Sequence, residues 1–101
     1  MARRFPEDSL LSDWKDSSRI IRTVTALRSE AHPAFLELNG KQMPLMHAQA
    51  GKRKYEGVAV PFVTRIAPDG FEVACLDGKT VFFSEIPLKE YNLQLNDRIK
   101  T

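Results

Sequence analysis

Apolar and polar residues alternate through residues 58–86 with the period of two that half-buried β-strands show. Two turn sequences, Pro68-Asp69-Gly70 and Asp77-Gly78, interrupt this alternation. Thr80–Glu85 is the last of the three segments that these turns separate. The apolar faces of the first two segments consist of Val58, Val60, Phe62, Ile66, Phe71, Val73 and Cys75. The pattern predicts a three-stranded antiparallel meander.

The start of the chain has a helical pattern instead. Residues 1–18 are the predicted helical segment, since Pro6 suits a first helical position. The apolar residues that follow have helical spacing and form one stripe: Leu10, Leu11 and Trp14. Ser17-Ser18 ends the segment. A helix of this length is marginal by itself, so we expect it to pack on the rest of the chain.

Further strands are predicted between this helix and the meander. Arg19–Leu27 is rich in β-branched residues, which favour strands. Ala34–Leu38 is a short strand, and Asn39-Gly40 is a strong hairpin-turn dipeptide. Met43–Gln49 is the returning strand. Within it, Pro44 lacks a donor N–H, which indicates a sheet edge or an irregular pairing.

These segments together predict the fold class. We expect a single small domain over residues 1–101, with a β-rich core over residues 19–101 and a last short strand at Leu95–Lys100. A sheet of short strands must close or stack to cover its apolar face. The sequence therefore predicts a mainly β protein. Its expected form is a small, partly open antiparallel β-barrel or curled sheet of about six short strands, with one short N-terminal helix packed on it.

Composition limits the chemistry and the location of the protein. Apolar residues make up 43% and charged residues 28% of the chain, which fits a folded, soluble protein. The single cysteine, Cys75, cannot form an internal disulfide, and neither His32 nor His47 has metal-ligand spacing. No apolar run reaches the roughly 20 residues that cross a bilayer. We predict a cytoplasmic protein with no metal, no cofactor and no membrane contact.

The distribution of charge singles out the sequence GKRKYEG at residues 51–57. Lys52, Arg53 and Lys54 can neutralise phosphates while Tyr55 stacks on a base, with Arg65 extending the patch. This interpretation gives a nucleic-acid-binding loop. The alternative is a solvated loop whose cations only keep a hairpin soluble. Neighbouring side chains alternate on a regular strand, so the three cations converge only if the segment is a loop.

Residues 55–99 contain a further pattern: a glycine before the strand that starts at Val58, then a DGF turn, and later the sequences SE and LND. In the order of these short sequences the segment is similar to S1-type oligonucleotide-binding barrels, and the similarity covers fewer than half the residues of the chain. The resemblance implies a barrel that binds single-stranded nucleic acid.

The aromatic residues suggest self-association. Phe82 and Phe83 are adjacent, so on a strand they point to opposite faces. One of them should be exposed in a monomer, unless the N-terminal helix covers it. Exposed apolar patches mark contacts, so we predict a homodimer interface at these two residues as the alternative to helix cover.

No convergent catalytic set is found in the sequence, and most carboxylates of the last third fit turn positions. The leading functional prediction is therefore a non-catalytic, self-associating binding or adaptor module. The first alternative is a single-stranded nucleic-acid-binding barrel that uses the 51–57 loop. The second is a small-ligand-binding protein or enzyme at the barrel mouth, with His47 as its active group.

Overall fold

The computed structural model describes residues 11, 14–27, 34–38, 41–86, 91 and 93–99. The elements are α1 (Ser17–Leu27), β1 (Phe35–Leu38), β2 (Lys41–Pro44), β3 (His47–Lys54), β4 (Phe62–Ala67), β5 (Gly70–Ala74) and β6 (Lys79–Ser84). The strands form a two-stranded sheet, β1-β2, and a four-stranded sheet in the order β3-β6-β5-β4. All pairings are antiparallel. This confirms the mainly β class with six short strands and one helix; over the described residues the sheet is curled and does not close into a barrel.

The predicted meander is present as β4-β5-β6. Ala67 pairs with Gly70, so Pro68 and Asp69 form the first tight turn. At the second turn Gly78 has a φ of 86°, a conformation that favours glycine. Gly70 is required for a different reason, because a Cβ there would overlap the backbone carbonyl oxygen of Phe83 on β6. The two turns therefore fix the order of the three strands, as the sequence predicts.

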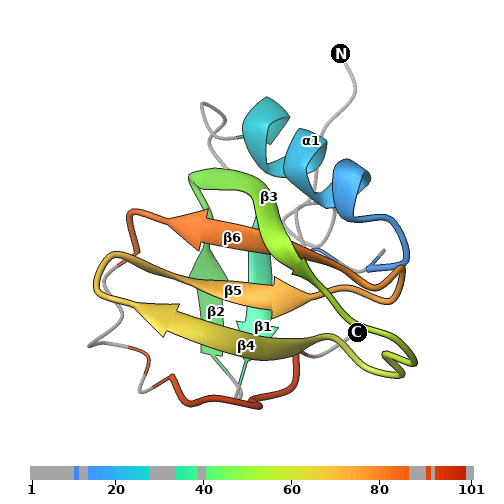
Figure 1. Cartoon of the computed structure of the whole chain (residues 1–101). Coiled ribbons are helices and arrows are strands. Elements are labelled where there is room, and N and C mark those ends of the chain that lie inside the picture. The colour runs from blue at the N-terminus through green and yellow to red at the C-terminus, as the bar shows by residue number, and fades with distance from the viewer. Residues whose placement is uncertain are drawn as a thin grey trace.

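Two layers enclose the core. The β1-β2 hairpin lies behind the four-stranded sheet and crosses its strands steeply, while α1 lies along β3 and β6 at the upper edge (Figure 1). The buried side chains between these layers include Ile20, Val24, Leu36, Leu38, Met43, Leu45, Val63, Phe71, Val73, Val81 and Phe83. None of the described residues forms a second layer in front of the opposite face of the four-stranded sheet (Figure 1). That open face carries the candidate site.

The prediction of a strand at Arg19–Leu27 is wrong, because this segment forms α1. Ile20 and Val24 are one helical turn apart and both are buried, so the apolar spacing outweighs the weak strand preference of β-branched residues. Asp16 caps the helix by accepting a hydrogen bond from the Arg19 N–H at 3.3 Å. Most of the predicted 1–18 helix lies outside the described residues, although Trp14 and Lys15 within it form a turn.

The segments around the meander also differ from the prediction. The expected Met43–Gln49 strand is divided, because the chain leaves the hairpin after Pro44 and enters the four-stranded sheet at His47. Pro44 ends a strand of a two-stranded sheet, in which both strands are edge strands, and an edge strand tolerates a residue without an N–H. The predicted Asn39-Gly40 turn lies outside the described residues. Of the Leu95–Lys100 strand, one isolated bridge between Arg98 and Phe62 is present.

The start of α1 is joined to the β5–β6 turn by Asp77. Its Oδ2 accepts hydrogen bonds from the backbone N–H and from the hydroxyl of Ser17, each at 3.0 Å. Its Oδ1 accepts from the Lys79 N–H at 3.0 Å. Partial burial acts to raise the pKa of Asp77, but these hydrogen bonds outweigh it and hold the pKa below its ordinary value of 3.8. The charged carboxylate therefore stabilises the folded state.

Replacing Asp77 with alanine is expected to lower the free energy of unfolding by about 1–2 kcal/mol at neutral pH. Because the folded-state pKa is depressed, this contribution is complete above the ordinary pKa and disappears as the pH falls through the folded-state value. Urea denaturation of the wild type and of Asp77→Ala should therefore differ at neutral pH and converge once the pH lies below the folded-state pKa of Asp77. Asp69→Ala, which changes an exposed aspartate before the other turn glycine, is the matched control. A difference that persists unchanged at low pH would contradict the assigned role.

Candidate functional site

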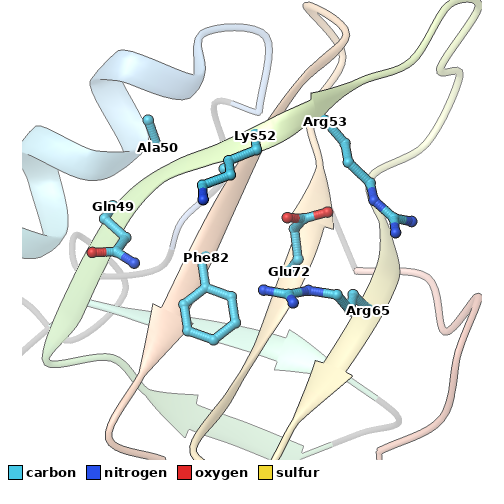
Figure 2. Close-up of a pocket in the computed structure, with 8 residues that line it drawn as sticks. Gln49, Ala50, Lys52, Arg53, Arg65, Glu72 and Phe82 are labelled. Atoms are coloured by element: carbon cyan, nitrogen blue, oxygen red, sulfur yellow. The ribbon is translucent and has the colours of Figure 1, made fainter.

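A cavity of about 210 Å³ lies on the open face of the four-stranded sheet (Figure 2). All four strands contribute to its lining, which consists of Gln49, Ala50, Gly51, Lys52, Arg53, Arg65, Glu72 and Phe82. We refer to this cavity as the basic pocket, since three of these side chains are cationic and one is anionic.

An irregularity in β3 brings adjacent cations to the basic pocket. The pairing of β3 with β6 is regular as far as Ala50 opposite Val81, and it resumes at Lys54 opposite Lys79. Over this interval β3 contains more residues than β6, which is a β-bulge. The bulge breaks the strict alternation of side chains, so the neighbours Lys52 and Arg53 both line the cavity. The prediction of a loop over residues 51–57 is therefore wrong for residues 51–54, which belong to β3, yet two of the cations converge.

Gly51 allows the bulged part of β3 to pass close over the sheet. A Cβ at this position would overlap the Thr80 hydroxyl and would lie 3.0 Å from Glu72 Oε2. The same Thr80 hydroxyl donates a hydrogen bond to the Arg53 carbonyl oxygen at 3.0 Å. The backbone that carries the cations is thus held against β6 by a side chain, in place of a regular ladder bond.

Glu72 forms the floor of the basic pocket. It lies at the centre of β5 and is only 3% exposed. The Thr64 hydroxyl donates to Glu72 Oε1 at 2.9 Å, and Thr64 itself sits where the pairing of β4 with β5 shifts register. Figure 2 shows the carboxylate between Lys52, Arg53 and Arg65. Burying a charge is costly without opposite charges nearby, and these cations provide them while leaving the pocket with net positive charge.

Arg65 and Phe82 form one wall. The guanidinium carbon of Arg65 lies 5.4 Å from the centre of the Phe82 ring, which is cation–π geometry. Phe82 is 8% exposed and points to the open face of the sheet. Arg65 pairs with Glu72 across β4 and β5, so its stem rises from the pocket floor. The wall therefore places a guanidinium beside an aromatic ring.

The structure gathers part of the predicted nucleic-acid site and separates the rest. Lys52, Arg53 and Arg65 line the basic pocket, whereas Lys54 ends β3 outside the lining. Tyr55 packs edge-on against Phe62 with the ring centres 5.9 Å apart, and it is also outside the lining. Sequence reasoning did not find two further lining side chains, Gln49 and Glu72. For Glu72 a signal exists, because it is the one charged residue within the otherwise apolar segment FEVAC.

The two phenylalanines are both covered within one chain. Phe83 is fully buried, with its ring centre 6.2 Å from that of Trp14 and 5.4 Å from that of Phe71. Phe82 lies beneath Arg65. The expectation that one of the pair is exposed is therefore wrong. The homodimer interface at Phe82 and Phe83 stays a prediction, and sedimentation of the protein over a range of concentrations tests it.

The remaining candidate groups lie away from the basic pocket. His47 Nε2 is 2.8 Å from Glu85 Oε2, and both side chains are exposed. Burial, with smaller effects from Asp77 and Asp16, raises the pKa of Cys75 to about 12, so this thiol is unreactive near neutral pH. In the part of the chain that the structure describes, no cluster of three or more metal-ligating side chains occurs. No helix formed by the described residues has the length and apolarity to cross a bilayer.

A second cavity of about 500 Å³ lies beside residues 56–60 and is also lined by Phe62, Asn96 and Arg98. Its charged lining residues are one acid and one base, Glu56 and Arg98. It therefore lacks the excess of one charge that gives the basic pocket its chemical character.

Comparison of the sequence with protein-family models and with curated proteins finds no match.

Proposed function

We propose that this protein is a non-catalytic binding protein whose basic pocket binds the phosphates of single-stranded nucleic acid. The observation that carries the proposal is the gathering of Lys52, Arg53 and Arg65 around one cavity on the uncovered face of the sheet. Cationic side chains provide most of the affinity of proteins for nucleic acid by displacing counterions from phosphates.

The form of the pocket favours a single strand over a duplex. The guanidinium of Arg65, whose carbon lies 5.4 Å from the centre of the Phe82 ring, has a planar face against which an unstacked base can stack. In a duplex the bases are stacked and paired, so they do not reach such a recess. The bulge in β3 forms a raised rim that carries Lys52 and Arg53, which suits a flexible phosphate backbone.

The lining argues for binding rather than catalysis. Among the described residues the lining contains one carboxylate and no histidine, cysteine, serine or threonine, so it has neither a hydroxyl or thiol nucleophile beside a base nor a carboxylate pair. The single acid, Glu72, is held by Thr64 and is surrounded by cations.

Binding of a fluorescent oligothymidylate of about ten nucleotides tests the proposal. Each phosphate contact contributes about −0.7 to the slope of log affinity against log salt for a single strand, so three contacts predict a slope of about −2. Between about 50 mM and about 200 mM salt, the affinity should then fall by roughly 15-fold. A duplex of the same length is the control and should bind more weakly. Absence of binding at low salt, or binding that salt does not weaken, would contradict the proposal.

A further inference from the structure

We infer that the basic pocket holds one base of its ligand and that Glu72 selects guanine. The inference rests on the proposed function and adds the identity of the base. It starts from the position of Glu72, which is nearly fully buried and yet lines a cavity bordered by Lys52, Arg53 and Arg65. Simple attraction of phosphates does not need a carboxylate at this place, because the negative charge weakens it.

The free side of the Glu72 carboxylate faces the cavity. Oε1 accepts the hydrogen bond from Thr64, which fixes the orientation of the group. Oε2 lies close to Gly51, where a Cβ would come within 3.0 Å of it, and the carboxylate belongs to the lining of the cavity. An ionised carboxylate has acceptors only, so it favours a partner that presents hydrogen-bond donors.

Guanine is the base whose pairing edge fits this requirement best. Its N1–H and N2 amino group are adjacent donors, and a carboxylate can accept both. Adenine and cytosine each place a ring-nitrogen acceptor beside their amino group, and thymine and uracil place a single N–H between two carbonyl oxygens. Against Glu72 each of these bases brings at least one acceptor close to a carboxylate oxygen, which is repulsive.

The remaining polar side chains of the lining complete the recognition. The Gln49 amide and the Lys52 ammonium border the same cavity, and both can donate to the guanine O6 acceptor. The guanidinium of Arg65 offers its plane to the base. The volume of about 210 Å³ is below that of pockets for drug-sized ligands, which agrees with one base rather than two.

The wild-type protein provides the first test. We expect an oligothymidylate with one central guanine to bind about tenfold or more tightly than the unsubstituted oligomer. Hypoxanthine at the same position retains N1–H and O6 but lacks the N2 amino group, so it should bind with intermediate affinity. Equal affinity for all three strands would overturn the selection of guanine and leave the phosphate-binding proposal standing. Failure of every strand to bind would overturn both.

Variants separate recognition from a general charge effect. Glu72→Gln should abolish the preference for guanine while binding the oligothymidylate as well as the wild type or more tightly, because a negative charge is removed. If Glu72 only balances the charge of the arginines, the substitution strengthens the binding of both strands equally, and that result would overturn the inference. Circular dichroism checks that the variant is folded.

The exposed position Gln49 provides a variant that does not depend on replacing a buried residue. Gln49→Ala should weaken binding of the guanine-containing strand severalfold more than binding of the oligothymidylate, so that the ratio of the two affinities falls. An equal loss of affinity for both strands would contradict recognition of the guanine O6 atom by Gln49.

Binding of free nucleotides shows whether the bound base belongs to a nucleic-acid strand or to a mononucleotide. With a strand as the ligand, guanosine 5′-monophosphate should bind more weakly than the guanine-containing oligomer but more tightly than uridine 5′-monophosphate. If the monophosphate binds as tightly as the oligomer and keeps the guanine preference, the selection of guanine is supported and the strand-binding proposal is contradicted. If neither monophosphate is preferred and the strands are also bound equally, the inference is overturned.

Discussion

Replacement of Trp14 by alanine is expected to lower the free energy of unfolding by about 3–5 kcal/mol. Trp14 is 1% exposed, and its indole packs edge-on against Phe83 in the core. Its Nε1–H donates to the Leu11 carbonyl oxygen at 2.9 Å, so the ring and its polar atom are both accommodated. Alanine leaves a cavity that the two sheets can fill only in part. Since domains of this size are stable by about 5–15 kcal/mol, the variant should be close to unfolding at 37 °C.

Urea denaturation followed by far-UV circular dichroism measures this loss, because the substitution removes the only tryptophan of the chain. Trp14→Phe is the matched control. It retains an aromatic ring against Phe83 but leaves the Leu11 carbonyl oxygen without its donor, so we expect a cost of about 1–3 kcal/mol. An alanine variant that loses less than about 1 kcal/mol would mean that Trp14 is outside the core.

The importance of Trp14 also reflects how the N-terminal segment is attached. The backbone N–H of Leu76 donates to the Trp14 carbonyl oxygen at 2.8 Å, and the N–H of Leu11 donates to Phe35 at 2.8 Å. Asp77 holds Ser17 a few residues later. The segment before α1 is thus tied to β1 and to the β5–β6 turn by bonds between residues far apart in sequence. No local pattern contains such pairings, which is why the sequence alone did not place this segment.

The meander was predictable because its information is local. Pro68-Asp69-Gly70 and Asp77-Gly78 specify turns by backbone preference, and the apolar residues of β5 and β6 alternate in phase with those turns. The apolar face predicted for the strand before them was incorrect in part. Val63 is fully buried, whereas Val60, which lies before β4, is 37% exposed, and Ile66, beyond the register shift between Val63 and Arg65, is 38% exposed. Alternation predicts strand faces only between bulges.

Helix α1 was not predicted, although the sequence contains the apolar spacing that favours it. In Arg19–Leu27 the β-branched residues gave a strand preference, while Ile20 and Val24 had the spacing of a helical face. Intrinsic preferences amount to a few tenths of a kcal/mol per residue, and burial of an apolar side chain amounts to 1.5–3 kcal/mol. Spacing therefore deserves more weight than residue type, and Asp16 before the segment is a further helix-start signal.

The sequence predicted the cations of the candidate site but not how they are arranged in space. Lys52, Arg53 and Arg65 are apparent from the sequence, and their convergence depends on a bulge whose length only the pairing of β3 with β6 reveals. The aromatic partner was assigned to Tyr55, whereas the ring at the pocket is Phe82. The charge at the middle of β5 was the available signal, because a carboxylate at the centre of an apolar strand needs a compensating environment.

Removal of the three pocket cations is expected to weaken binding of an oligothymidylate on the order of 100-fold at low salt, with the salt dependence nearly lost. The variant replaces Lys52, Arg53 and Arg65 by glutamine, which retains much of each aliphatic stem and thus keeps Phe82 covered. Each cation lost removes the release of counterions from one phosphate, so the slope of log affinity against log salt should fall from about −2 towards zero. Fluorescence anisotropy at several salt concentrations measures both quantities.

The matched control replaces three exposed cations outside the lining, Lys15, Arg22 and Lys54, by glutamine. It lowers the net charge of the chain by the same amount, so it isolates the effect of position. We expect a loss of only a few fold, because none of the three side chains lines the cavity and their charges contribute only through the general field of the protein. Equal losses in the two variants would show that affinity follows net charge alone. In that case the bulge in β3, which places Lys52 and Arg53 together, would have no part in binding.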